Sequence, residues 1–101
     1  FIFSLSQNFR THHSVSFYAA EQCLTPRYFS TIVREKSGRN ALQWIMMFII
    51  AEAKKLLSDP DPSIKEIAET LGFSNQSFFG RYFKQYVGLS PMAFRSSGTK
   101  E

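Results

Sequence analysis

The sequence predicts an all-α fold of about seven helices, with two similar helical units on either side of a long central helix. No segment alternates apolar and polar residues for more than a few positions, and there is no Asn-Gly or Asp-Gly hairpin signal. Polar caps and glycines divide the chain into helix-sized segments. The segments before and after the central helix also repeat each other. These three observations exclude a sheet and predict a duplicated helical domain.

Helix starts are marked by polar side chains that can accept hydrogen bonds from the first free backbone N–H groups. Two of these residues precede a proline, which is favoured at the first helical position, and two others have the spacing of a capping box. In chain order, the starts are Thr25 before Pro26, Asn40 with Gln43, Ser63 with Glu66, Ser74-Asn75 before Gln76, and Ser90 before Pro91.

Helix ends are marked by glycine and proline. Gly38, Gly72 and Gly88 can adopt the left-handed conformation that ends many helices. The two prolines within 59–62 exclude a helix there. The starts and ends together predict helices over 2–12, 15–22, 26–37, 41–58, 64–71, 75–87 and 91–96.

The predicted helix over 41–58 is the longest, and it is apolar on more than one side. Trp44 and Phe48 form a second apolar strip beside its main apolar face. A helix of this kind is buried between neighbours, so we expect a central position for it. Its main face comprises Leu42, Ile45, Met46, Ile49, Ala53, Leu56 and Leu57, at spacings of three and four residues.

An internal repeat relates the segments on the two sides of this helix. The offset between the copies is 49 residues at first and 50 residues later, so the second copy has one extra residue near 75–77. An insertion at a helix start costs little, because the first turn lacks internal hydrogen bonds. The matching pairs are Ser14-Val15 with Ser63-Ile64, Tyr18-Ala19 with Ile67-Ala68, Leu24-Thr25 with Phe73-Ser74, Phe29 with Phe79, Val33 with Phe83, Gly38 with Gly88, and Trp44 with Phe94.

Each copy consists of a short helix, a turn of about four residues and a longer helix. Ala19 and Ala68 hold the same place in the two short helices. A small residue there lets the second helix cross closely at a steep angle, which is the geometry of a helix-turn-helix. The repeat by itself is equally compatible with two duplicated helical hairpins that have no role in nucleic-acid binding.

The second helix of each copy carries a polar stripe. In a helix-turn-helix this helix enters the major groove with its N-terminal residues towards the bases. Arginine can bond guanine, glutamine can bond adenine, and serine or threonine can bond several base edges. We therefore expect base contacts from Arg27, Ser30, Thr31, Gln76, Ser77 and Arg81. We expect contacts with the DNA backbone from Thr25, Arg34, Asn75, Gly80 and Lys84, with Phe29, Ile32, Val33, Phe79 and Phe83 facing the core.

The charge distribution also favours an anionic partner. The 101 residues, enough for one compact domain, carry a formal net charge of +4, and the sequence pI is about 9.5. Between positions 72 and 100 there are four basic residues and no acidic one. This local bias is more informative than the overall charge.

The chain resembles the C-terminal DNA-binding domain of the AraC/XylS family of bacterial transcription regulators. The residues that carry the resemblance are Ile64-Lys65-Glu66-Ile67-Ala68, Gly72-Phe73-Ser74-Asn75-Gln76-Ser77-Phe78-Phe79, Arg81, Phe83-Lys84, Gly88, Ser90-Pro91 and Phe94-Arg95. The match reaches back to about Val15. It implies a DNA-binding domain over 14–98, with helix-turn-helix units at 14–39 and 63–96, a linker helix at 40–58, and recognition helices at 26–37 and 75–87.

The resemblance further implies sequence-specific binding of double-stranded promoter DNA by a cytoplasmic, nucleoid-associated regulator. We expect an activator that contacts RNA polymerase. Residues 1–13 resemble a connector from a preceding N-terminal domain, which would mediate dimerisation, and 99–101 form a tail. Two positions depart from the family. Ile49 replaces a usual arginine, which predicts more apolar contacts, and Cys23 replaces a usual glycine in the first turn.

Nothing in the sequence indicates an enzyme, a cofactor, a metal site or a membrane anchor. The longest apolar run, 45–51, is seven residues, against roughly 20 for a membrane span. His12 and His13 point in different directions on a helix and are expected in solvent. Cys23 is expected to be a small buried residue, and Asp59 with Asp61 to belong to a loop.

Two other function classes remain open at this point. A helical protein-interaction module would use the basic stripes only for solvation. An RNA-binding domain would expose aromatic side chains for stacking on unpaired bases. Most aromatic residues here fall on core positions, and Tyr28 and Phe78 are the exceptions to check.

Overall fold

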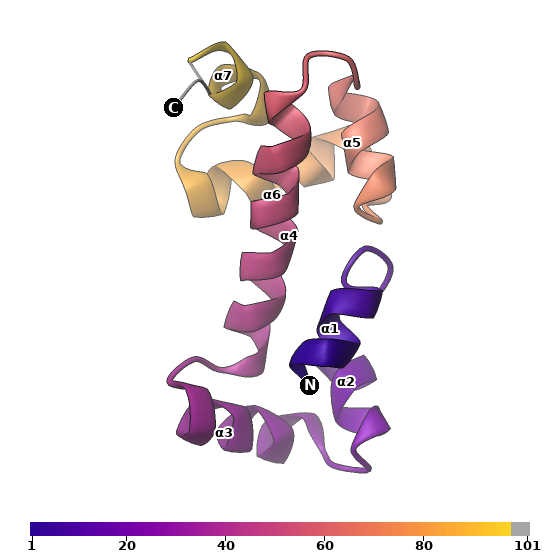
Figure 1. The fold of residues 1–101 in the computed structure, drawn as a ribbon, viewed down its shortest axis with the longest axis vertical. Helices are drawn as coiled ribbons and strands as arrows, with labels where there is room; N and C mark the ends of the chain where they lie inside the picture. Colours follow the sequence, from indigo (N-terminus) through magenta and orange to yellow (C-terminus); the bar gives the residue numbers. More distant parts are fainter. Residues whose placement is uncertain (98–101) are drawn as a thin grey trace. The chain divides into compact units, whose positions relative to one another are not determined.

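The computed structural model describes residues 1–97, and these form seven α-helices and no strand, which confirms the predicted fold class (Figure 1). The expected tail over 99–101 and the last residue of the expected domain lie outside the described residues. The helices are α1 (Ile2–Asn8), α2 (Val15–Glu21), α3 (Pro26–Ser37), α4 (Ala41–Ser58), α5 (Ile64–Thr70), α6 (Gln76–Val87) and α7 (Pro91–Ser96).

The chain divides into two compact units. The first covers Phe1–Ile49, and the second begins at Ile50. The boundary lies within α4, so each unit contains one half of this helix together with its own short and long helix. Residues 1–13 therefore belong to the first unit.

The predicted helix caps are present. The Thr25 hydroxyl accepts a hydrogen bond from the Tyr28 N–H at 3.2 Å, and the Asn75 side chain accepts one from the Phe78 N–H at 2.7 Å. Ser63–Glu66 and Asn40–Gln43 form the two reciprocal capping boxes, and Ser90 caps α7. Gly38, Gly72 and Gly88 all have φ between 83° and 94°. These local signals fix six of the seven helices to within one residue of the predicted bounds.

Helix α1 ends at Asn8, so the prediction that it reaches residue 12 is wrong. The chain turns because Ser14 must adopt an extended conformation to cap α2, and the Tyr18 hydroxyl donates to the His12 carbonyl at 2.8 Å. The expectation that His12 lies in solvent is also wrong, since its ring is half-buried and stacks on Phe17 with centroids 3.7 Å apart. Burial raises the pKa of Tyr18 to about 12, with a smaller effect from Glu21, so this hydroxyl stays a donor near neutral pH.

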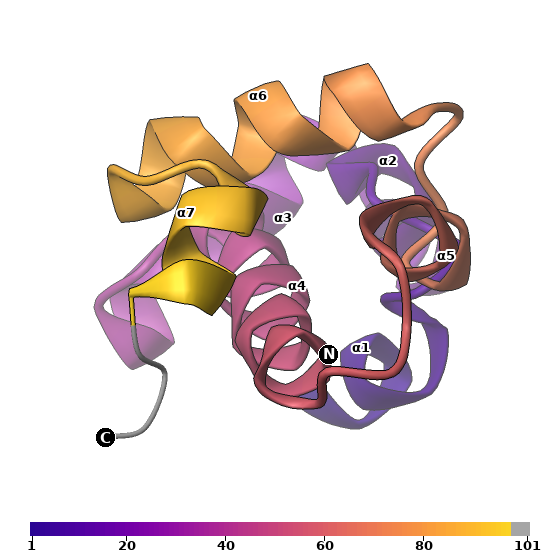
Figure 2. The ribbon, with the colours of Figure 1, turned by 90° about the horizontal axis from the view of Figure 1, so that it is seen from above.

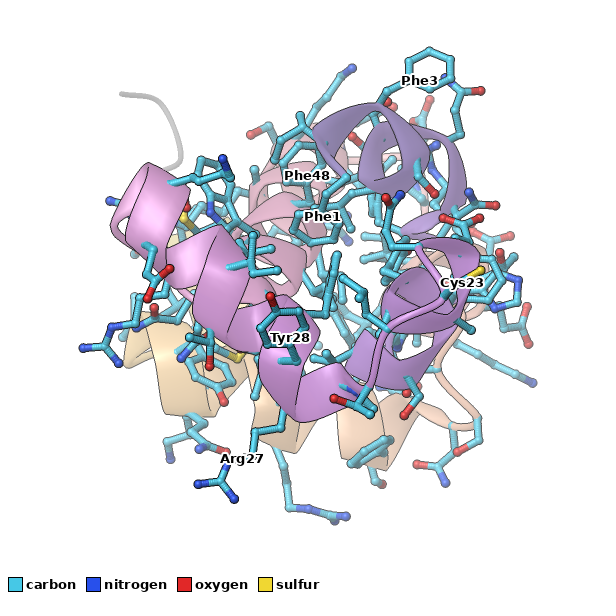
Figure 3. All side chains as sticks on the ribbon, turned by 90° about the horizontal axis from the view of Figure 1, so that it is seen from below. Phe1, Phe3, Cys23, Arg27, Tyr28 and Phe48 are labelled. Atoms are coloured by element: carbon cyan, nitrogen blue, oxygen red, sulfur yellow. The ribbon has the colours of Figure 1, made fainter. Side chains whose placement is uncertain are left out.

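Helix α1 and its two cap residues, Phe1 and Phe9, contribute to the core of the first unit. Leu5 is fully buried, and the Phe9 ring packs edge-to-face on Phe48 at 5.8 Å. Phe1 packs in the same way on Phe29 at 5.1 Å, and Figure 3 shows Phe1 and Phe48 turned towards the interior of the unit. The segment expected to be a connector is thus also part of this unit's packing.

One row of α4 is fully buried, and it shares four residues with the predicted face of seven, of which Met46 and Leu56 are only half-buried. Leu42 is 47% exposed, so the prediction that it lies in the core is wrong. The buried row repeats strictly every four residues from Ala41, which places Leu42 about 100° away from it. Its members are Ala41, Ile45, Ile49, Ala53 and Leu57. Ile49, where an arginine was expected from the family pattern, is therefore an apolar core residue.

The turns of the two repeats have the same geometry. The Leu24 N–H donates to the Ala19 carbonyl at 3.0 Å, and the Phe73 N–H donates to the Ala68 carbonyl at 2.9 Å. Cys23 has a φ of 60°, in the same left-handed region as the equivalent Gly72 at 83°. Cys23 is exposed, so the expectation that it is buried is wrong (Figure 3). The first unit thus has an exposed side chain on the left-handed residue of its turn, where the second unit has a glycine.

Replacing Cys23 with glycine should stabilise the first unit by about 0.5–1 kcal/mol. The left-handed conformation costs an L-residue roughly 1–2 kcal/mol, which glycine avoids. Glycine loses more backbone entropy on folding, so part of this gain is offset. Urea unfolding under reducing conditions would measure this gain. Cys23→Ser keeps a Cβ atom at the same φ and should give none. Equal stability of Cys23→Gly and the unmodified chain would show that the turn is unstrained.

In each unit the short helix crosses the long one closely. Ala19 and Ala68, both at most 1% exposed, lie in α2 and α5. In Figure 1, α3 runs across the direction of α2, and α6 runs across that of α5. The absence of a larger side chain at these two positions allows the close crossing, so both units have the predicted helix-turn-helix arrangement.

The Ala68→Leu substitution should destabilise the second unit by about 1–3 kcal/mol, because extra methyl groups overpack a closed crossing. Thermal unfolding would measure the loss. Ala51→Leu is the matched control, since Ala51 is exposed in the same unit and the change there should stay within about 0.5 kcal/mol. If Ala68→Leu left the melting temperature unchanged, the close crossing would be refuted.

Helix α7 closes the second unit against α6 and the end of α4. Phe83 and Phe94 pack edge-to-face at 5.6 Å, and Figure 2 shows α7 lying against α6. Arg95 donates hydrogen bonds to the carbonyls of Leu57 and Asp59, at 3.2 and 3.0 Å. Because the last carbonyls of a helix lack internal partners, this guanidinium caps α4 and holds the following loop.

Candidate nucleic-acid interface

The predicted polar stripe of α3 is exposed for most of its length. Arg27 and Tyr28 leave the first turn of the helix in different directions (Figure 3). Arg27, Thr31 and Arg34 are all exposed, while Phe29 is buried and Ile32 is half-buried. Arg27, Thr31 and Arg34 therefore form the outer face of α3, and the first of them lies at its N-terminal end.

The equivalent face of α6 is also exposed and polar and lies opposite buried aromatic residues, but its residues differ from those of α3. Gln76, Ser77, Arg81 and Lys84 are exposed, and Phe79 and Phe83 are fully buried. At an offset of 50 residues, Ser77 takes the place of Arg27, and Arg81 takes the place of Thr31. The two outer faces thus present different donors and acceptors from the same positions.

Ser30 and Gly80 occupy equivalent positions at the edge of the outer faces, and both are half-buried. The Ser30 hydroxyl accepts a hydrogen bond from the Ala41 N–H at 3.4 Å. In the second unit Pro91 replaces Ala41 and has no N–H, so the matching acceptor is not needed. A Cβ atom added at Gly80 would meet nothing within 4 Å, so packing within the domain does not require glycine there.

The predicted backbone-contact residues Thr25 and Asn75 are the exposed N-caps of α3 and α6. Each uses one oxygen lone pair for its cap. The Thr25 hydroxyl and the Asn75 amide can still donate hydrogen bonds to an anion at the helix N-termini, which free N–H groups make favourable for negative charge. The caps and the outer faces therefore meet at the first turn of each long helix.

Two exposed aromatic side chains flank these faces. Tyr28 is 56% exposed and Phe78 is 46% exposed. The sequence identified them only as two aromatic residues that do not fall on core positions. The signal that identifies them as a pair is their equivalence at an offset of 50 residues.

Burial affects one ionisable group beside the α6 face. It raises the pKa of Tyr82, with a smaller effect from neighbouring Tyr86. The Tyr82 ring packs on Phe73 with centroids 5.1 Å apart. Because this hydroxyl stays protonated, it adds no negative charge beside Arg81, and the face keeps its positive character at neutral and mildly alkaline pH.

Within residues 1–97, no group of three or more His, Cys, Asp and Glu side chains is placed to hold a metal ion. None of the helices in this range combines the length and the apolar character that crossing a bilayer requires.

Comparisons with known proteins agree with this geometry. A helix-turn-helix domain family model matches residues 18–97. The arabinose operon regulatory protein of Salmonella typhimurium is 34% identical over 86 residues, which cover 85% of this chain and 31% of that protein. The corresponding Escherichia coli protein is 33% identical over the same length and 30% of its chain is covered. The chain thus spans about a third of the length of these relatives.

Solved structures share the fold. The C-terminal domain of AraT, a response regulator from Geobacillus stearothermophilus, aligns with a TM-score of 0.85 at 23% identity and covers 97% of this chain and 82% of that one. The DNA-binding domain of AdpA, solved in complex with a target DNA, aligns with a TM-score of 0.79 at 27% identity, over 95% of this chain and 86% of that one.

Proposed function

Since this chain belongs to the AraC family of helix-turn-helix transcription regulators, whose members bind specific DNA sequences, we propose that it recognises one duplex site through α3 and α6. Base contacts come from Arg27 and Thr31 on α3, and from Gln76, Ser77 and Arg81 on α6. Arg34, Lys84 and the two caps contact phosphates. Ser30, expected to contact a base, and Gly80, expected to contact the DNA backbone, would lie at the edge of the surface that contacts DNA.

One observation carries the proposal. The same positions on the second helix of each repeat are exposed and polar, and they lie on the turn that enters the major groove in this motif. The bound AdpA domain supports DNA as the ligand, because it shares the fold at 27% identity. Selecting duplexes from a random pool tests the proposal, which requires one preferred sequence to emerge.

Arg27→Ala and Arg81→Ala should each weaken binding to the selected duplex by about 1–3 kcal/mol, the value of a good bidentate base contact. They should also change the order in which single-base variants of the duplex are preferred. Arg34→Ala and Lys84→Ala are the matched controls, since as phosphate contacts they should weaken all the duplexes evenly. If Arg27→Ala and Arg81→Ala left the order of preference untouched, these residues would not read bases.

The two outer faces differ in sequence, so the proposed site is asymmetric. Each unit would read one short block, and the uninterrupted helix α4 would act as the spacer in the complex. Its 18 residues give a length of about 27 Å at roughly 1.5 Å per residue. Successive major-groove segments on one face are about 34 Å apart, and off-axis helices with some DNA bending can bridge the difference. One chain would therefore protect two blocks about ten base pairs apart.

A second part of the proposal concerns the activity of the whole protein. We infer an activator that binds promoter DNA in the cytoplasm and contacts RNA polymerase, without enzymatic activity of its own. The support is the similarity to the operon regulatory proteins named above, of which this chain covers about a third. Dimerisation is assigned to a further domain attached through residues 1–13. Activation of a reporter by the full protein tests this part.

A further inference from the structure

The exposed aromatic residues of the two repeats occupy one and the same helical position. Tyr28 and Phe78 are each the third residue of a 12-residue helix, and the cap residue of that helix holds the backbone N–H of each. The neighbouring aromatic residues Phe29 and Phe79 are buried. A single exposed ring is common on a protein surface. Tyr28 and Phe78 differ from the other exposed apolar residues because they recur at one repeat-equivalent position, on the first turn of each long helix.

The position borders the faces assigned to base contacts. At 100° per residue, Tyr28 lies beside Thr31 on α3, and Phe78 lies beside Arg81 on α6. Both aromatic residues belong to the first helical turn, which approaches the bases in this motif. Tyr28 is 56% exposed, and Figure 3 shows its ring in front of the α3 ribbon, on the side towards the viewer.

Phe78 has a defined setting in the second unit. Its ring packs edge-to-face on Phe73 with centroids 5.7 Å apart, and the Arg81 guanidinium carbon lies 5.9 Å from its centre. The Phe78 ring has no hydrogen-bonding atom, so it cannot read a donor or an acceptor on a base edge. In the major groove the C5-methyl group of thymine is the distinctive apolar feature of the base edges.

We propose that Phe78 and Tyr28 are specificity-determining residues that read thymine, each packing its ring against a thymine methyl group in the block read by its own unit. This inference rests on the proposed function and names a readout that the polar residues do not supply. Arg81 and Phe78 together would read a guanine next to a thymine.

The two rings fit thymine methyl groups in a duplex better than they fit the unpaired bases of single-stranded RNA. A surface that stacks single-stranded RNA presents several neighbouring aromatic faces. Here each exposed ring stands alone on its helix turn, and Phe73 and Arg81 already contact part of the Phe78 ring. Binding to single-stranded RNA is therefore treated as an outcome of the test.

The test uses the duplex that this chain selects from a random pool, with thymidine replaced by deoxyuridine at one position at a time. This replacement removes only the methyl group. At one position in each block, the unmodified chain should bind the deoxyuridine duplex about three- to fivefold more weakly, the value of one buried methyl-sized group. Phe78→Ala should remove this difference in the α6 block, and Tyr28→Ala should remove it in the α3 block.

Two further variants separate methyl recognition from folding. Phe78→Leu keeps an apolar side chain and should retain part of the thymine preference. Tyr86→Ala is the matched control, because Tyr86 is a 44% exposed aromatic residue at the other end of α6. It should leave the thymine preference intact. The thermal stability of every variant is measured alongside, so that a loss of folding is recognised. The deoxyuridine scan uses the unmodified chain, so its result does not depend on whether a variant folds.

The inference is overturned if no deoxyuridine substitution weakens binding by the unmodified chain, or if Phe78→Ala and Tyr28→Ala keep the full thymine preference. It is also overturned if these two variants lose affinity for single-stranded oligouridylate and not for the duplex. If the pool yields no preferred duplex, the proposed function itself fails. A preferred duplex without thymine discrimination would instead leave the proposed function standing.

Discussion

Raising the salt concentration from 50 to 200 mM should weaken binding of this chain to its selected duplex by about a hundredfold. Each phosphate neutralised by a cation releases condensed counterions, which gives a slope of about −0.9 in log affinity against log salt. The outer faces of α3 and α6 supply Arg27, Arg34, Arg81 and Lys84, all exposed. Arg34 and Lys84 are assigned to phosphates, and Arg27 and Arg81 also bring their charge between the phosphates of the groove. If all four cations displace counterions, the slope is about −3.6.

This measurement also separates the function classes that the sequence left open. A helical protein-interaction module has no counterion atmosphere to displace, so its affinity for an uncharged partner surface would change little with salt. The double variant Arg34→Ala, Lys84→Ala should reduce the magnitude of the slope by about 2, since each lost phosphate contact removes about one unit. An affinity for duplex DNA that stayed the same between the two salt concentrations would contradict the proposed interface.

The sequence predicted the local features of the fold well, because each depends on neighbouring residues. The Ser63–Glu66 box and the Thr25 cap are short-range hydrogen bonds, and both are present in the structure. Gly38 is likewise left-handed, with φ of 86°. The early end of α1 at Asn8 was missed because residues 9–13 contain no glycine or proline to mark it.

Errors in burial had a similar origin. Leu42 was placed in the core from its spacing alone, but which side of α4 is covered depends on the helices that pack around it. Cys23 was expected to be buried because cysteine usually is, and its left-handed turn overrides that tendency. Ser30 has the right spacing for the polar stripe, yet it bonds the first N–H of α4.

The predicted interface residues are located by the fold, but their contacts with bases stay a prediction. The outer faces could be derived from the repeat, because helical periodicity places Arg27 and Thr31, or Ser77 and Arg81, on one side. Which base each one reads depends on the docking of the helix in the groove and cannot follow from the spacing of residues. The sequence had already marked Tyr28 and Phe78 as the aromatic residues outside the core pattern, and the structure confirms that both are exposed.

Insertion of five base pairs between the two blocks of the selected duplex tests the central claim, that both units read one site through a helical spacer. Half a turn of duplex moves one block to the opposite face, so one unit loses its base contacts, each worth about 1–3 kcal/mol. Specific affinity should fall by at least about a hundredfold. Insertion of ten pairs should not restore it, since α4 cannot lengthen by the roughly 34 Å of another turn.

The control places the same five pairs outside the two blocks, where they should have no effect. The decisive measurement is the affinity for the duplex with five inserted pairs relative to this control, together with the footprint on each. The account predicts a loss of at least about a hundredfold and protection of a single block. Equal affinity for the two duplexes would show that the units act independently or that only one of them contacts DNA, and it would contradict the two-unit mechanism.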